Sequence, residues 1–357
     1  MTQLLEQPPT SAEPVPSLEV ITAGQMLSLE SAATHAATFA NQGVVQYDNL
    51  LIGEKRAKEM MIAGFILGGN VLLAGQPGGG KSTMLENAHR IIGGIQDNEV
   101  AFVPHRADLT AAQLVGDAAT IFRETGENPV LREKIMTMIA SIITPESRVI
   151  IFDEINRGNP YVLNAALGFL AQRTLNANGK LFKMNGVELI ASSANPDEGS
   201  KTTFRMPPAL GSRQSLGAML GNGDAAERDM IQDKLWDQNW KSTPESMTPI
   251  ISTSMLHGIR AAVEKVPFND EAKRLGKKVS KATRDELAGL GIKEADGRIT
   301  EQIRGTSRAL TLMRGRQTTN ETDIKDAVEY TLTGRLAAQP NGASRIEAAT
   351  ERVLNAA

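Results

Sequence analysis

The feature that most constrains this chain is a glycine-rich octapeptide from Gly75 to Ser82, with the sequence GQPGGGKS. It fits the pattern GxxxxGK[ST], in which successive backbone N–H groups wrap a polyphosphate. Glycines suit this task because a side chain would obstruct the anion and because they readily adopt positive φ angles. An apolar run over Val71 to Ala74 precedes the loop, and a helical pattern over Thr83 to Ile92 follows it. This context predicts a strand, a phosphate-binding loop and a helix in succession.

The loop also predicts individual ligands. It opens a helix whose N-terminal amides and dipole favour a bound anion. We expect Lys81 to reach the β- and γ-phosphates and the Ser82 hydroxyl to take a Mg²⁺ position. The expected nucleotide-binding residues are Gly75, Gln76, Pro77, Gly78, Gly79, Gly80, Lys81, Ser82 and Thr83.

A second motif places two carboxylates at the end of an apolar strand. The run from Val149 to Phe152 is of the buried-strand kind, and Asp153 and Glu154 follow it directly. Beside a phosphate-binding loop, Asp153 can hold Mg²⁺ while Glu154 orients and deprotonates the attacking water. Asp153 is therefore a predicted metal-site residue and Glu154 a predicted catalytic base.

Around these residues the chain resembles the MoxR group of AAA+ ATPases, from about Asn49 to Arg335. The most characteristic match is DEINR at residues 153–157, followed by a helical pattern over Tyr161 to Arg173. The segment Ala107 to Gly116 resembles the one that precedes an inserted hairpin in this family. The resemblance implies that Ala118 to Asn128 carries this insert and faces a central pore.

The resemblance also assigns two sensor residues. An apolar strand pattern over Val187 to Ala194 delivers Asn195, which is similar to the family's sensor 1. A neutral amide there can donate to the γ-phosphate or hold the lytic water. Arg308 resembles sensor 2 at the start of a lid helix, which implies contact with the γ-phosphate. The pattern over Thr319 to Leu336 fits a further lid helix.

An arginine finger is expected near Arg213. The segment Met206 to Arg213 resembles the family segment that ends in a finger, an arginine that reaches the nucleotide of the neighbouring subunit. The usual Asp-Arg-Phe ending is replaced here by Ser-Arg-Gln. Arg205 or Arg157 could therefore share the role that Arg213 is expected to have.

Composition agrees with a cytoplasmic enzyme of two domains. The chain has 357 residues, 41% of them hydrophobic, and a formal net charge of −3. This charge gives no general attraction to nucleic acid or an anionic membrane. The chain has no cysteine, and its four histidines are scattered without the spacing of a metal site. The polar, proline-rich start lacks a secretory signal pattern, and the apolar stretch Met60 to Gly75 is too short for a membrane span.

The predicted fold is an α/β three-layer P-loop NTPase core of the AAA+ type with a parallel sheet, followed by a smaller all-α lid domain. The expected divisions are a disordered tail over residues 1–30, the nucleotide-binding domain over 31–221, the helical lid over 222–340 and a C-terminal tail over 341–357. The lid also holds a basic cluster, for which a solvated helix face is the first interpretation and contact with a partner or nucleic acid the second. Its members are Lys273, Arg274, Lys277, Lys278, Lys281 and Arg284.

These observations predict a Mg²⁺-dependent ATPase of the MoxR type that remodels or matures a protein partner in a chaperone-like role. Resemblance implies ATP rather than GTP, a ring that is usually a hexamer, and partners with a von Willebrand factor A domain. Nucleic acid and membrane insertion are not expected. Two alternatives stay open, namely the ATPase subunit of a metal chelatase and a DNA-acting AAA+ motor or loader. A scaffold that binds ATP without turnover is disfavoured because Lys81, Asp153 and Glu154 occur together.

Overall fold

The computed structural model describes most of the chain in separate ranges. These are residues 27–104, 142–144, 146–157, 160–177, 180–196, 208–221, 225–237, 241–293, 296–339 and 341–357. Several predictions fall outside the described residues, namely most of the tail, the segment Ala107 to Gly116, the insert Ala118 to Asn128 and Arg205.

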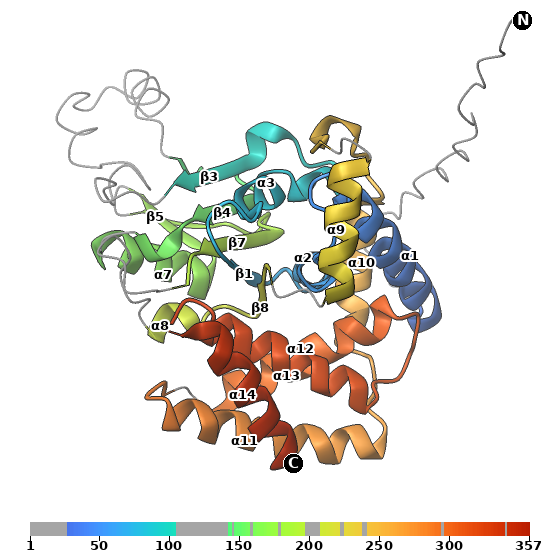
Figure 1. Cartoon of the computed structure of the whole chain (residues 1–357), viewed down its shortest axis with the longest axis vertical. Helices are drawn as coiled ribbons and strands as arrows, with labels where there is room; N and C mark the ends of the chain where they lie inside the picture. Colours follow the sequence, from blue (N-terminus) through green and yellow to red (C-terminus); the bar gives the residue numbers. More distant parts are fainter. Residues whose placement is uncertain are drawn as a thin grey trace, which may run out of the picture.

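A five-stranded parallel sheet forms the centre of the molecule, with strand order β3-β4-β7-β1-β8 (Figure 1). The strands are β1 (Asn70–Ala74), β3 (Val100–Pro104), β4 (Val149–Asp153), β7 (Leu189–Ala194) and β8 (Leu216–Met219). Every residue of β1 and β7 is buried, as expected for parallel strands covered on both faces. The register pairs Ala74 with Ala194 and Pro104 with Asp153, so the carboxyl ends of neighbouring strands lie level.

Short helices and ribbons complete the core around this sheet. α2 (Lys55–Leu67) packs against β1 and β8, and α3 (Lys81–Glu86) packs against β4 and β7. α3 is shorter than the predicted helix, because Ala88–Ile91 continues as a 3-10 turn. The remaining core elements are α7 (Pro160–Gln172), α8 (Pro208–Gly211), the antiparallel pair β5 (Thr174–Ala177) and β6 (Lys180–Lys183), and the short pair β2 (Ile92–Gly93) and β9 (Ile251–Ser252). The predicted P-loop core is confirmed.

Helices form the rest of the described chain. α11 (Asp270–Gly289), α12 (Asp296–Met313), α13 (Glu321–Leu336) and α14 (Gly342–Asn355) lie together in the lower half of Figure 1. The other helices are α1 (Leu29–Tyr47), α9 (Ala225–Asp237) and α10 (Thr253–Val263). α1 packs against α2, α10 and α12. The exact division of the chain at residue 221 stays a prediction.

The C-terminal tail predicted over residues 341–357 is a packed helix instead. α14 contacts α11 and α13, and its side chains Ile346, Ala349 and Val353 are buried. Their spacing of three and four residues places them on one helix face. The segment predicted as a C-terminal tail is therefore a helix packed on the lid, and the exact division of the chain at residue 341 stays a prediction.

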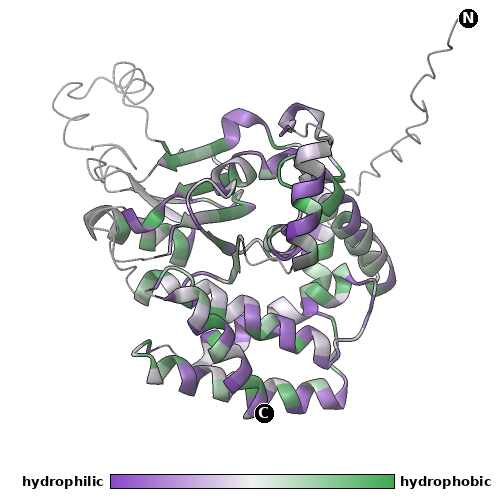
Figure 2. Ribbon diagram, viewed as in Figure 1, coloured by the Kyte–Doolittle hydropathy of each residue, from purple (hydrophilic) through white to green (hydrophobic). Residues whose placement is uncertain are grey.

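Hydrophobic residues concentrate on the strands, whereas the outer helices carry many hydrophilic residues (Figure 2). Among the described helices, none is long and apolar enough to cross a membrane.

The predicted basic cluster lies on α11. Its residues Lys273, Arg274, Lys277, Lys278 and Lys281 are exposed.

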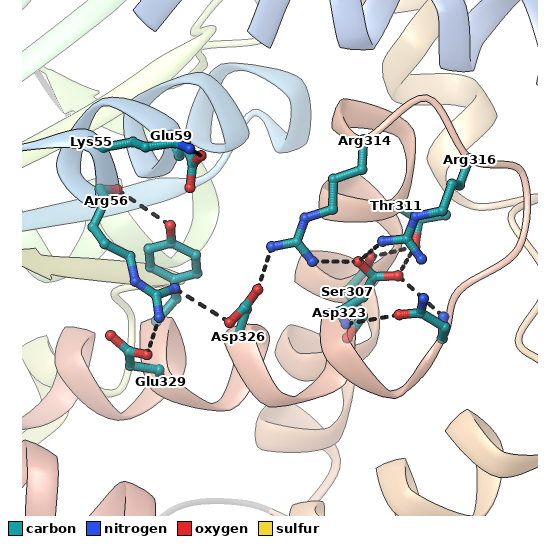
Figure 3. A network of polar contacts seen from close by, with 12 residues as sticks. Lys55, Arg56, Glu59, Ser307, Thr311, Arg314, Arg316, Asp323, Asp326 and Glu329 are labelled. Carbon is teal, nitrogen blue, oxygen red and sulfur yellow. Dashed lines mark hydrogen bonds and ion pairs between the residues drawn. The ribbon is translucent and has the colours of Figure 1, made fainter. Parts of the chain in front are cut away.

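Arg56, an arginine on α2, joins this helix to α13. The Arg56 guanidinium donates to Glu329 at 2.5 Å, lies 3.5 Å from Asp326 and sits 5.5 Å above the centre of the Tyr330 ring (Figure 3). Asp326 also pairs with Arg314 near the end of α12. Linked ion pairs of this kind hold geometry better than isolated surface pairs. They connect the sheet-covering helix to two lid helices.

β8 and α13 are in direct backbone contact. A Cβ atom on Gly217 would lie 2.3 Å from the Gly334 nitrogen, so β8 and α13 could not approach each other this closely if Gly217 had a side chain. Beside this contact, the buried Arg335 guanidinium donates to the carbonyl of Gln214 at 3.3 Å and also bonds Gln302. α13 is therefore packed directly on the edge strand of the sheet.

The close approach predicts a large effect of one methyl group. Gly217→Ala should reduce the free energy of unfolding by about 1–3 kcal/mol or more, because the new methyl group overlaps α13 backbone atoms. Denaturant unfolding of the two proteins measures this difference. Gly168→Ala on α7 is the control, because a Cβ there meets nothing within 4 Å and should be neutral or slightly stabilising. A Gly217→Ala variant as stable as the wild type would contradict the contact.

Candidate functional site

The phosphate-binding loop connects β1 to α3 in the predicted conformation. Gly78 and Gly80 both have φ 82°, which is the left-handed region that favours glycine. A Cβ on Gly80 would also lie 2.9 Å from the Leu51 side chain, whereas one on Gly78 would meet nothing within 4 Å. The loop therefore has open space beside Gly78, which a side chain at this position would fill.

Lys81 is a buried cation folded against the loop. Its side chain is 6% exposed, and Nζ donates to the carbonyls of Gly75 and Gln76 at 2.8 Å each. Burial lowers the pKa of Lys81, and the nearby Asp153 and Glu154 carboxylates oppose this effect. An ammonium group desolvated in this way and bonded to neutral carbonyls is well suited to a phosphate. The residues present thus fit a polyphosphate.

Ser82 and Asp153 meet across the loop. Ser82 Oγ lies 3.1 Å from each carboxylate oxygen of Asp153, which comes from the end of β4. Hydroxyl and carboxylate oxygens are the ligands that Mg²⁺ takes in nucleotide sites, where it keeps waters and phosphate oxygens as its other ligands. The predicted pair is therefore in place for a magnesium ion beside bound phosphate.

Glu154 is held by two donors on different oxygens. Asn195 Nδ2 donates to Oε1 at 2.8 Å, and Arg157 Nη1 lies 3.2 Å from Oε2. Glu154 itself has φ 50°, an uncommon value for a residue with a side chain. Within the described part of the chain, the Oδ1 atom of Asn195 is buried without a hydrogen-bond partner, so it can accept from a further group. The predicted base and the predicted sensor 1 therefore form one unit.

Two further residues organise this unit and do not stand out in the sequence. Ser193 on β7 donates from Oγ to Asp153 and accepts from the backbone N–H of Glu154 at 2.7 Å. Asn156 is fully buried and donates from Nδ2 to the Asn195 carbonyl at 2.7 Å. These bonds tie the end of β4 to the end of β7. A pair of serines, Ser192 and Ser193, in a strand whose other residues are apolar was the available signal.

A cavity of about 580 Å³ opens beside the loop. It is lined by residues 75–79, Glu54, Pro196, Gly221 and the first residues of α14, 341–344. Glu54 fixes one wall by accepting a hydrogen bond from the Gly221 N–H at 2.7 Å. This volume is typical of a small-molecule site.

Arg213 lies at the amino ends of the parallel strands, called the amino edge, whereas the P-loop lies at their carboxyl ends, the carboxyl edge. Asn70, the first residue of β1, donates to the Arg213 carbonyl at 2.8 Å, and Arg213 Nη1 donates to the Ala209 carbonyl at 2.7 Å. With Arg173 and Arg298 it lines a second cavity of about 410 Å³. The structure therefore does not bring Arg213 to the P-loop of its own chain.

Arg308 also lies away from the P-loop. Its Nη1 pairs with Glu264 at 3.2 Å, and its guanidinium lies 5.1 Å from the centre of the Phe268 ring. α12 begins beside α8, where Arg298 donates to Ser212 Oγ at 3.1 Å. The helix therefore runs along the amino edge of the sheet rather than over the loop. Arg308 is not among the described residues that line the cavity beside the loop, where residues 341–344 supply the lid side, and its contact with the γ-phosphate stays a prediction.

Comparison with known proteins agrees with this geometry. Residues 70–214 match the AAA domain (dynein-related subfamily). The chain is 24% identical to Chaperone MoxR1 of Mycobacterium tuberculosis over 302 residues, which cover 83% of this chain and 74% of that protein. It is also 24% identical to Protein MoxR of Paracoccus denitrificans, covering 87% of this chain and 92% of that protein. The match to Protein MoxR of Methylorubrum extorquens, at 24% identity, covers 60% of this chain and 59% of that protein.

A solved structure supports the fold. The crystal structure of a proposed ATPase from Cytophaga hutchinsonii superimposes with a TM-score of 0.65 at 17% identity, covering 92% of this chain and 97% of that chain. The parallel sheet, the phosphate-binding loop and the helical C-terminal part define a P-loop NTPase of the AAA+ class. Within this class, the chain is similar to three proteins named MoxR and resembles a MoxR-type AAA+ ATPase.

The two bonds of Ser193 predict a catalytic effect. Ser193→Ala should reduce turnover about tenfold or more, because Asp153 and the Glu154 backbone each lose a hydrogen bond worth about 1 kcal/mol. Steady-state ATP hydrolysis measures the loss, and nucleotide affinity should change little. Ser192→Ala is the matched control, because Ser192 Oγ contacts Gln214 instead, at 3.3 Å. Equal losses in the two variants would contradict the proposed anchor.

Proposed function

We propose that this protein hydrolyses ATP with Mg²⁺ and uses the energy to remodel or mature a protein partner. The observation that carries the proposal is the meeting of Lys81, Ser82, Asp153, Glu154 and Asn195 at the carboxyl edge of three adjacent strands. In open parallel sheets this edge is where ligands bind. The choice of ATP over GTP rests on the family.

Each group has a chemical task in this proposal. The loop amides and Lys81 bind the phosphates, and Ser82 and Asp153 hold the magnesium ion, which neutralises developing negative charge when bound. Glu154 takes the proton of the attacking water, and Asn195 orients the carboxylate. The cavity beside the loop offers room for the ribose and base. These roles follow from the chemistry of the residues that the structure groups together.

Assembly into a ring, which we take to be a hexamer, is part of the proposal. Arg213 is separated from its own P-loop by the length of β1, so a role in hydrolysis requires the site of another subunit. A head-to-tail interface that closes into a ring supplies that arrangement. The name of one relative, Chaperone MoxR1, supports action on a protein partner. A partner with a von Willebrand factor A domain is the first candidate to test.

Two substitutions separate binding from turnover. Lys81→Ala should weaken ATP binding at least tenfold, because it removes the cation from the phosphate cradle. Glu154→Gln should keep binding and lose about 10²-fold or more in turnover, because it removes the base and leaves the cradle intact. Fluorescent-nucleotide titration and phosphate release measure the two effects. Normal hydrolysis by Glu154→Gln would contradict the role of the acidic pair.

The position of Arg213 predicts complementation between subunits. Arg213→Ala alone should bind ATP normally and lose about 10³-fold in turnover, as expected when an arginine finger is removed. When Arg213→Ala and Glu154→Gln subunits are mixed, some junctions contain an intact Glu154 and an intact Arg213. Hydrolysis by the mixture should therefore exceed that of either variant. Absence of any recovery in co-assembled rings would leave Arg213 without a role in the neighbouring site.

A further inference from the structure

We infer that Arg157 acts within its own chain, as a positioning residue for the Glu154 carboxylate, rather than across a subunit junction. The inference rests on the proposed hydrolytic function and names a residue for that same site. It separates two arginines that sequence alone leaves as alternatives, because Arg157 and Arg213 lie at opposite edges of the sheet.

The contact between Arg157 and Glu154 belongs to a fixed local structure. Both residues belong to the turn that follows β4, in which the Arg157 N–H donates to the Glu154 carbonyl at 2.8 Å. The side chains pair over the same turn, with Arg157 Nη1 3.2 Å from Glu154 Oε2. Asn156, between them in this turn, is anchored to the Asn195 carbonyl at 2.7 Å. The pair is therefore part of the strand connection and not an encounter of two long surface side chains.

The two donors that contact Glu154 bind different oxygens of its carboxylate. Asn195 bonds Oε1 and Arg157 pairs with Oε2, so rotation of the carboxylate about its last bond would break one contact or both. Each oxygen keeps a further lone pair that can accept a proton from water. An orientation fixed before the reaction avoids the free energy of arranging the base during it. Arg157 thus contributes through the position of Glu154.

Its surroundings also place Arg157 at the phosphate end of the site. The positive charge of Arg157 is near enough to Lys81 to add to the lowering of the Lys81 pKa, for which burial is the main cause. Its side chain as a whole is 38% exposed, and among the described residues its Nε atom is buried without a hydrogen-bond partner. Use in a neighbouring subunit would require Arg157 to leave Glu154 and the turn that holds it.

The test compares four variants in steady-state ATP hydrolysis: Arg157→Ala, Arg157→Lys, Glu154→Gln and the double variant Arg157→Ala/Glu154→Gln. We expect Arg157→Ala to lower kcat about tenfold to a hundredfold with KM for ATP changed less than about threefold, because the phosphate cradle is untouched. Arg157→Lys should recover part of kcat, since it keeps the charge. The double variant should be no slower than Glu154→Gln, because Arg157 acts through Glu154.

Mixed assemblies then decide between action within one chain and action across chains. If Arg157 serves its own Glu154, no junction formed from Arg157→Ala and Glu154→Gln subunits has both groups, and mixing should give no recovery. The mixture of Arg213→Ala with Glu154→Gln is the matched control, in which recovery is expected.

Three results would overturn the inference. They are recovery in the Arg157→Ala mixture, a KM effect that accounts for the whole loss, and multiplicative effects in the double variant. A wild-type protein that binds ATP without hydrolysing it would refute the proposed function itself, and the inference with it. Wild-type hydrolysis combined with any of the three results refutes only the role of Arg157.

Discussion

The alignment of three parallel strand ends is the constraint on which the candidate site depends. β4, β7 and β1 are neighbours in the sheet, and their register brings Phe152, Ser192 and Leu72 level with one another. The residues that follow these strands therefore reach the same edge. A shift of one residue in β4 would turn Asp153 away from Ser82 and break the bond that Ser193 makes to it. Hydrophobic burial of the strands thus determines the geometry of the polar groups at their ends.

The lid helix α13 is fixed to the edge strand β8 and to helix α2. Gly217 and Gly334 allow β8 and α13 to touch backbone to backbone, and Arg56 links α2 to α13 through Asp326 and Glu329 (Figure 3). Asp323, also on α13, is fully buried and accepts bonds from Arg314, Arg316 and Thr311. Because the contacts of Gly217 and Arg56 join core to lid, while those of Asp323 tie α13 to the end of α12, a change in position of α13 would have to break them together. The contacts favour movement of the helices and the sheet edge as one body.

Sequence predicted the core of the site because each motif has a local signal. The glycines, the buried apolar runs and the residues that end them all follow from chain-local physics, and the parallel sheet then brings them together. Ser193 and Asn156 were missed because their partners, Asp153 and the Asn195 carbonyl, are near them only in the fold. The position of Arg308 beside Glu264 could not be predicted for a similar reason. Resemblance locates an arginine along α12, but the path of α12 depends on packing against α1 and α2. The packing of α14 against the lid was not predicted because alanines and polar residues surround its buried side chains Ile346 and Val353.

The two ends of the parallel strands differ in the charged groups that they carry, which bears on the proposed site between subunits. The carboxyl edge has its own cation, Lys81, balanced by Asp153 and Glu154. The amino edge gathers Arg173, Arg213 and Arg298 around a cavity that Glu264 and Glu301 also line, and burial together with the nearby Arg260 lowers the pKa of Arg173 to about 10. In the proposed ring, the amino edge of one subunit would face the nucleotide held at the carboxyl edge of another. The separation of Arg213 from Arg157 fits this arrangement, because a group that arranges the base must stay in the chain that carries it, whereas one that neutralises charge developing in the transition state can come from outside.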